Sequence, residues 1–219
     1  MIQKFIQALF FLFTLSIHAN TWTAGVKATV PLGIGVEAGY LFLNHLQVRG
    51  VANYFQFNHT VAYSHAPFYG EIRLLTAGLM GDYYPFKSVF RLTGGLLYNG
   101  NQLKLAVTPK KNVKIHGTTY PTAEIGTIHA RFHYYPLAPY VGLGFDTNAT
   151  SPGFSFTIDF GCIFQNDIKG TITSITGDLI SNQQKEINDL NDYLVGFVNS
   201  NYWYLRTTPV LSLGFNWRW

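Results

Sequence analysis

The residues of this 219-residue chain that could do ionic or acid–base chemistry are few and well separated. Charged residues make up 12% of the sequence, about half the usual share. Many of them alternate with glycine, serine or threonine along segments whose other face is apolar. Charges of both signs in such positions suit a narrow polar interior where they must pair, because a lone buried charge is costly. We therefore expect a lumen charge network of Lys27, Glu37, Arg49, Glu71, Arg73, Arg91, Arg131 and Asp159.

Histidines supply the other candidates for catalysis or metal binding. His129 and His133 share a strand face, but they stand about 13 Å apart at strand rise, which is too far to bind one metal ion without other ligands. His59, His65 and Ser64 place a base and a nucleophile in one predicted loop without a nucleophile motif. The sequence therefore predicts no catalytic residues, no metal site and no cofactor.

The elements that carry these residues are predicted to be strands. Apolar and polar residues alternate cleanly along 22–30, 33–43, 90–98, 127–135 and 154–164. The C-terminal 211–219 alternates in the same way. Less regular or shorter segments compatible with strands are 46–57, 69–84, 138–146 and 168–176. Together they give about ten strands. The alternative is eight strands, with 22–30 and 168–176 outside the wall.

The connections between these segments alternate in length. Short turns are expected at 44–45, 85–88, 136–137 and 165–167, and longer stretches at 58–68, 100–125, 147–152 and 177–203. Transmembrane barrels have tight turns at one end and long loops at the other. A soluble sandwich would instead expose a face rich in lysine and glutamate. The sequence thus predicts an all-β, antiparallel up-and-down barrel that crosses a membrane.

Two segments depart from the strand pattern. Residues 1–19 read as a secretory signal peptide, with Lys4, an apolar stretch and Ala19 before the cleavage point, so the barrel domain would cover 20–219. Residues 178–198 carry apolar side chains at helical spacing after Asp178, a good N-cap. We expect an amphipathic helix there, in the last outer loop, which leans over the barrel mouth. Residues 100–125 are expected to form a long outer loop.

Surface features suggest partners. Aromatic residues gather at predicted strand ends, as membrane anchors do, and the set includes Tyr83, Tyr134, Trp217 and Trp219. In the 100–125 loop, Lys110, Lys111 and Lys114 would favour anionic groups such as the phosphates of lipopolysaccharide. The pI of about 9.1 arises from a net charge of only +4 without a basic helix, so nucleic acid is not an expected partner.

Several stretches together resemble a known family. "GIGVEAGYLF", "VRGVANYFQF", "DYYPF", "FRLTGGLLYNGN", "APYVGLGFD" and the terminal "PVLSLGFNWRW" look like small, largely uncharacterised outer-membrane β-barrel proteins of Gram-negative bacteria. The resemblance implies an outer-membrane location, contact with outer-membrane lipid, and recognition of the C-terminal aromatic strand by the barrel assembly machinery. It carries no active site to transfer.

From these features we expect a non-enzymatic outer-membrane protein with a structural or surface-interaction role. The alternative is a porin-like narrow pore for small solutes. A second alternative is an outer-membrane hydrolase or lipid A modifying enzyme. The oligomeric state is left open.

Overall fold

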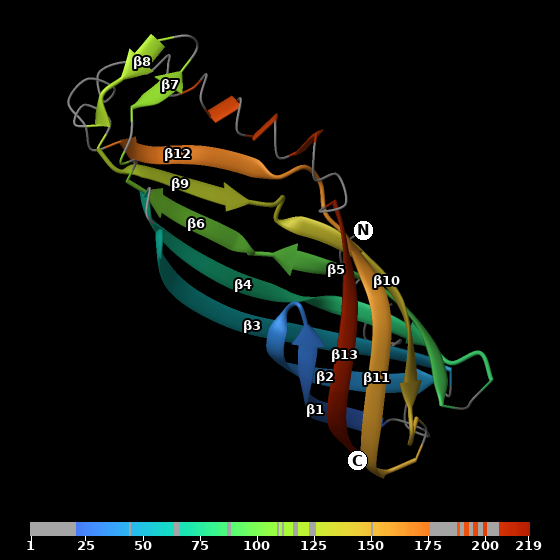
Figure 1. Cartoon of the computed structure of the whole chain (residues 1–219). Helices are drawn as coiled ribbons and strands as arrows, with labels where there is room; N and C mark the ends of the chain where they lie inside the picture. The colour runs from blue at the N-terminus through green and yellow to red at the C-terminus, as the bar shows by residue number, and fades with distance from the viewer. Residues whose placement is uncertain are drawn as a thin grey trace, which may run out of the picture.

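The structure, a computed structural model, describes residues 21–43, 45–63, 66–86, 89–108, 110, 112–115, 118–122, 126–149, 151–175, 188, 191–192, 195–196, 199–200 and 206–219. Most of them lie in antiparallel strands (Figure 1). These are β1 (Thr21–Val30), β2 (Gly33–Leu43), β3 (Leu46–Tyr63), β4 (Ala66–Tyr83), β5 (Phe90–Asn99), β6 (Gln102–Val107), β7 (Val113–Ile115), β8 (Thr118–Tyr120), β9 (Ile128–His133), β10 (Leu137–Asp146), β11 (Gly153–Phe164), β12 (Lys169–Ile175) and β13 (Thr207–Arg218). No helix among the described residues is long and apolar enough to span a membrane.

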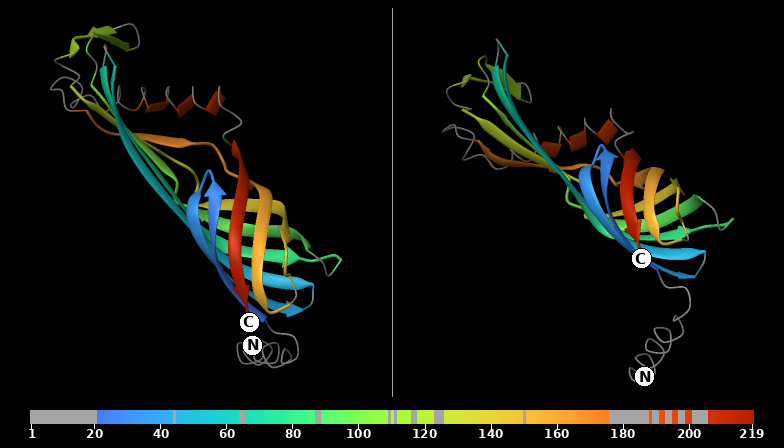
Figure 2. Two further views of the ribbon diagram at one scale, coloured as in Figure 1. Left: turned by 60° about the horizontal axis from the view of Figure 1, so that its bottom comes forward. Right: turned by 90° about the horizontal axis from the view of Figure 1, so that it is seen from below.

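Eight strands close into a barrel. The ring runs β1, β2, β3, β4, β5, β10, β11 and β13, and β13 pairs with β1 to complete it. The C-terminus lies at one end, here called lower, together with the turns that follow β2, β4 and β10 (Figures 1 and 2). Neighbouring strands are antiparallel throughout, so the wall is an up-and-down barrel as the sequence predicts.

The barrel wall therefore has eight strands, and their membership differs from both predicted counts. The segment 22–30, which the eight-strand alternative left out, is β1 and closes the ring against β13. β9 and β12 lie above the ring and pair with each other. β9 leads directly into β10, and β12 follows directly after β11. Pro136 and 165–167 therefore mark breaks within long strands and not the expected turns, and 147–152 lies at the lower end.

Above the ring, the strands extend on one side into an open sheet. β4 pairs with β5 as far as Thr76↔Asn99 and then with β6 from Arg73↔Gln102, so β5 and β6 follow one line. β9 pairs with β6, and β12 pairs with β9. We call this the upper sheet; it comprises the upper halves of β3 and β4 with β6, β9 and β12, and it leans away from the barrel axis (Figure 2). The first residues of the expected 100–125 loop thus form β6.

Within the barrel, polar side chains point inward and apolar ones outward. On β13, Ser212, Asn216 and Arg218 are buried, whereas Phe215 and Trp217 are each 52% exposed. The same split holds around the ring. The large exposed side chains of the barrel wall include Trp22, Val26, Ile34, Val36, Val48, Leu79, Leu92, Leu96, Tyr98, Leu137, Val141, Phe145, Phe154, Phe160, Leu211 and Leu213. This inside-out distribution matches a barrel surrounded by lipid.

In the upper sheet, the two faces exchange character. The face that continues the barrel interior becomes apolar, and the face that continues the barrel exterior becomes polar. The ladders place the apolar residues Phe55, Phe57, Ile72, Leu74, Leu103, Leu105, Ile128, Ala130, Phe132 and Ile172 on the first face. They place the polar residues Gln56, Asn58, Glu71, Arg73, Gln102, Lys104, His129, Arg131, His133, Lys169 and Thr171 on the second. The upper sheet thus has the pattern of a sheet with one face in water.

The outward face changes from apolar to polar at one height along the strands. We call this height the boundary between the lipid-facing barrel and the upper sheet. On the exterior of β4, the apolar run ends at Leu75 and polar residues begin at Arg73. From Tyr83 to Leu75 the strand covers about 26 Å, and at a tilt of about 40° that is about 20 Å of height, close to the apolar band of outer-membrane barrels. The outward tyrosines Tyr54, Tyr98 and Tyr135 lie at this boundary, where an aromatic girdle is expected.

This boundary predicts where an arginine is tolerated. Leu79 is 66% exposed in the middle of the band, so Leu79→Arg should destabilise the inserted barrel by about 2–4 kcal/mol. Asn58→Arg on the polar face of the upper sheet should change stability by less than about 0.5 kcal/mol. Urea unfolding of both variants in lipid vesicles would measure the difference. Equal effects would contradict the placement of the boundary.

The helix predicted over 178–198 lies largely outside the described residues. Residues 188, 191–192, 195–196 and 199–200 are helical and run beside the upper sheet (Figure 2). Val195 approaches the apolar face closely, because a Cβ atom on Gly170 would lie 2.6 Å from its Cγ2 atom. Asn199 exchanges two hydrogen bonds of 3.0 Å with the backbone of Ile168. This helical segment is therefore tied to the break between β11 and β12.

Candidate functional site

Six buried charges meet in the middle of the barrel, and Arg49 is at their centre. Its Nε and Nη2 atoms donate to the two oxygens of Asp82 at 2.9 and 3.1 Å. Its Nη1 atom donates to Glu37 Oε2 at 2.6 Å and to Asp159 Oδ2 at 3.5 Å. One guanidinium thus joins three carboxylates from three strands. Bidentate arginine–carboxylate pairs of this kind combine strength with fixed geometry.

The remaining members complete a neutral layer. Arg91 Nη2 donates to Asp159 Oδ1 at 2.7 Å, and Lys27 Nζ lies 3.2 Å from Glu37 Oε2. We call the six residues Lys27, Glu37, Arg49, Asp82, Arg91 and Asp159 the charge layer; it contains three cations and three carboxylates. Thr93 and Asn216 donate further hydrogen bonds to Asp82 and Glu37. Full pairing offsets the desolvation that burial imposes on each charge.

A second pair lies below the charge layer. Arg218 Nη2 donates to Asp146 Oδ2 at 3.1 Å, and both residues are almost fully buried. Tyr84, also buried, donates to Gln47 Oε1 at 2.9 Å beside them. The lower half of the interior is therefore filled by buried polar side chains, of which Arg218 keeps its Nε and Nη1 atoms without an acceptor.

Inward-facing glycines make room for these long side chains. A Cβ atom on Gly144 would lie 2.2 Å from Asp159 Oδ1 and 2.9 Å from Arg91 Nε. A Cβ atom on Gly161 would lie 2.3 Å from the Tyr140 hydroxyl. The glycines on the polar face of the sequence pattern thus provide the space into which the charges and Tyr140 fit.

An apolar layer closes the barrel above the charges. It consists of the buried residues Leu32, Val51, Met80, Leu97, Ala138, Tyr140, Ile163 and Val210. Between this apolar layer and the charge layer, a cavity of only about 20 Å³ is bordered by Lys27, Arg49 and Asp159. A space of that size holds about one water molecule. An eight-stranded barrel is just wide enough for side chains to fill, and both layers fill this one.

The structure brings together five of the eight residues proposed for the lumen network, namely Lys27, Glu37, Arg49, Arg91 and Asp159. The prediction is wrong for Glu71, Arg73 and Arg131, which lie on the polar face of the upper sheet. The cause is strand parity. Asp82 and Glu71 are eleven positions apart, and β4 pairs with β3 without the bulge that would put them on one face. Asp82 and Asp146, which the prediction omitted, are two further inward carboxylates beside Glu37 and Asp159.

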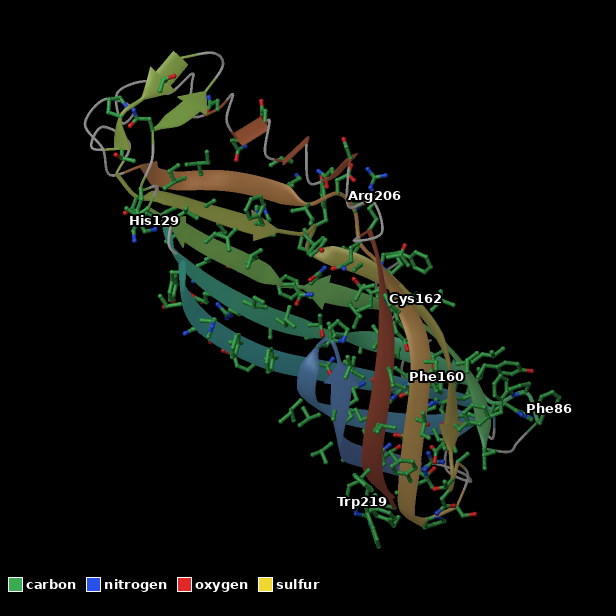
Figure 3. The ribbon with its side chains drawn as sticks, viewed as in Figure 1. Phe86, His129, Phe160, Cys162, Arg206 and Trp219 are labelled. Carbon is green, nitrogen blue, oxygen red and sulfur yellow. The ribbon has the colours of Figure 1, made fainter. Side chains whose placement is uncertain are left out.

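The polar face of the upper sheet has its own charge pattern. Lys104 Nζ lies 3.0 Å from Glu71 Oε1, and Arg131 is directly opposite Lys104 in the ladder. A pocket of about 120 Å³ lies on this face between β4, β6 and β9. Its polar lining comes from Tyr69, Lys104, His129 and Arg131. His129 stands here at the far end of the sheet, well away from Phe86 and Trp219 (Figure 3).

The apolar face carries a larger pocket of about 490 Å³ beside the barrel mouth. Ile72, Leu74, Leu103 and Phe132 line it, with Tyr134 at its edge. Burial raises the pKa of the Tyr134 hydroxyl above its usual value. Tyr134 was expected near the lower end as a membrane anchor. It is instead half-buried at the upper boundary, because β9 and β10 run in the same direction.

The other expected anchors lie on the barrel exterior at the lower end. Tyr83, Trp217 and Trp219 are 47%, 52% and 59% exposed. Of the loop lysines, Lys110 is exposed, Lys114 belongs to β7, and Lys111 lies outside the described residues. Residues 1–19, predicted to be a signal peptide, also lie outside them.

The histidines do not assemble with other candidate ligands in the described part of the chain, where no group of three metal-binding side chains occurs. His59 stacks on Phe57 with ring centroids 5.8 Å apart. His129 and His133 share the polar face of β9, as predicted, and Ser64 and His65 lie outside the described residues.

A closed antiparallel barrel with a polar interior and an apolar exterior defines the class of outer-membrane β-barrel proteins. Solved structures agree with this fold. Acinetobacter baumannii CarO2 has a TM-score of 0.56 at 16% identity, covering 91% of this chain and 98% of its own. Acinetobacter baumannii CarO has a TM-score of 0.53 at 14% identity, covering 90% and 97%. No family model and no curated protein matches the sequence.

Proposed function

We propose that the protein spans the outer membrane of a Gram-negative bacterium and holds the upper sheet above it without conducting solutes. The exchange of polarity between barrel and upper sheet carries this proposal. An apolar exterior requires lipid, and a polar exterior requires water, so the two halves of β3 and β4 suit two different surroundings. The barrel is then the anchor, and the upper sheet is the part available at the cell surface.

The filled interior supports the non-conducting role. Solutes in an open barrel follow a continuous water path, whereas here the charge layer and the apolar layer lie one above the other. Opening a path would separate Arg49 from carboxylates that are almost completely buried. Breaking a buried pair in this way is strongly unfavourable. A structural and surface-interaction role without catalysis is therefore the function that the geometry supports best.

Planar-bilayer recordings test this role. Folded protein, identified by its heat-modifiable mobility on gels, should insert and show no discrete conductance steps, while an open porin prepared in the same way conducts. Reproducible single-channel steps from the folded protein would overturn the non-conducting role and favour a narrow pore. Failure of folded protein to insert into bilayers would overturn the membrane-spanning role itself.

A further inference from the structure

Four cations lie in two adjacent rows across the polar face of the upper sheet, just above the lipid-facing band. Arg73 comes from β4, Lys104 from β6, Arg131 from β9 and Lys169 from β12. We call this set the basic stripe. In the described part of that face of β4, β6, β9 and β12, Glu71 is the one carboxylate. The stripe thus carries an excess of positive charge at the predicted level of the outer headgroups.

Among the described residues, only one of the four cations is neutralised by an ion pair. Lys104 pairs with Glu71, whereas Arg73, Arg131 and Lys169 have no carboxylate partner in that part of the chain. Arg73 is also incompletely satisfied, because its Nε atom is buried without a hydrogen-bond acceptor. A buried donor without an acceptor is unfavourable, so an anion bound at Arg73 would supply the hydrogen-bond acceptor that its Nε atom lacks.

The stripe has a fixed geometry. Arg73, Gln102, His133 and Lys169 are consecutive partners across four strands, and Glu71, Lys104 and Arg131 form the next row. Lys169 is held with its Nζ atom 4.0 Å from the ring centroid of Tyr135, a residue of the boundary. The 120 Å³ pocket beside Lys104 and Arg131 gives a small anionic group a place to enter. Paired strands thus hold the cations in position before any ligand binds.

We propose that the basic stripe binds the phosphate groups of the outer-leaflet glycolipid, lipid A, and so docks the upper sheet onto the membrane surface. This proposal rests on the membrane-spanning function proposed above. Two features select a lipid-borne phosphate. The stripe lies where the exterior changes from apolar to polar, at the headgroup level, and each lysine or arginine near an anionic membrane surface adds to attraction. The upper sheet leans away from the barrel axis (Figure 2). In a membrane, this inclination would hold the outward face above the adjoining lipid.

Two charge-matched variants separate the stripe from the loop lysines. R73Q/R131Q/K169Q removes the three stripe cations that lack carboxylate partners and leaves the Lys104–Glu71 pair intact. K110Q/K111Q/K114Q removes the same number of charges from the loop. Native mass spectrometry in an uncharged detergent would measure the binding of lipid A and of the same lipid after phosphatase treatment. Inorganic phosphate alone is the third probe.

The stripe variant should bind lipid A about 100-fold more weakly than the wild type, and the loop variant should stay within about threefold. Phosphatase-treated lipid A should bind the wild type as weakly as intact lipid A binds the stripe variant. The proposal is overturned if the loop variant alone loses binding, if phosphatase treatment has no effect, or if inorganic phosphate binds as tightly as lipid A.

The same samples keep the two proposals apart. Each variant is first checked for heat-modifiable mobility and for insertion into bilayers. If the wild-type protein inserts into bilayers but does not bind lipid A, the stripe proposal alone is overturned. Wild-type protein that does not insert overturns the membrane-spanning function, whatever its affinity for lipid A in detergent.

Discussion

Replacing Arg49 by leucine should destabilise the folded barrel by about 3–5 kcal/mol, because it leaves buried carboxylates without their main partner. Arg49 is the one described residue that contacts Glu37, Asp82 and Asp159 together. Its loss turns a neutral layer into one with a net charge of −1. Urea unfolding of the variant in lipid vesicles, compared with the wild type, would give the change in the free energy of unfolding.

Two further variants show whether the cause is the loss of a partner by buried carboxylates and not the net charge alone. Lys27→Met removes a cation whose partner, Glu37, keeps Arg49 at 2.6 Å, so it should cost clearly less than Arg49→Leu. Asp82→Asn in the Arg49→Leu background restores neutrality and should recover about 2 kcal/mol, a coupling that a double-mutant cycle measures. A cost below about 1 kcal/mol for Arg49→Leu, or no recovery in the double variant, would refute this account of the charge layer.

The barrel could be predicted from the sequence because, in a lipid-embedded strand, the polarity of each residue indicates whether its side chain faces lipid or the interior. Leu213, Phe215 and Trp217 alternate with Ser212 and Asn216, and the structure exposes the first set and buries the second. The same local rule found Lys27, Glu37, Arg49, Arg91 and Asp159. Those residues lie in the parts of their strands that stay below the boundary, within the lipid-facing barrel.

Prediction from this alternation failed where a strand leaves the lipid-facing part of the barrel wall. Along β4 the inward face carries Asp82 and Thr76 below the boundary and Leu74 and Ile72 above it, so this face changes from polar to apolar within one strand. The assumption that the inward face is polar along the whole strand therefore assigns Glu71 and Arg73 to the wrong face. The tyrosines at the boundary, followed upward by outward charges, are the signal that could have placed the change.

Strand breaks were ambiguous for a related reason. Pro136 cannot donate to the ladder, which indicates an interruption but not whether the chain turns back or continues. Continuation is decided by partners far along the sequence, since Leu137 pairs with Tyr98 and His133 pairs with Gln102. Local composition contains no information about those pairings, so β9 and β12 were counted as wall strands.

Replacing Phe215 and Trp217 together by aspartate should abolish stable membrane assembly. Both side chains are 52% exposed on the barrel exterior, and Phe215 stacks on Phe154 and contacts Phe156 with tilted rings, both residues of β11. Two carboxylates on this face would meet lipid, and β13 closes the ring against β1. The heat-modifiable band in isolated outer membranes should therefore disappear. The control F215L/W217F keeps an apolar exterior and should assemble normally.

Folding into lipid vesicles without assembly machinery then identifies the physical cause. If lipid contact is what these side chains provide, F215D/W217D should fail in vesicles as well, whereas T207D, a carboxylate at the upper end of the same strand, should fold. If F215D/W217D folds in vesicles but not in cells, the aromatic strand serves chiefly as a recognition signal for the machinery. Normal heat-modifiable barrel of F215D/W217D in both settings would refute the lipid-facing placement of β13, because neither lipid contact nor recognition would then depend on its aromatic face.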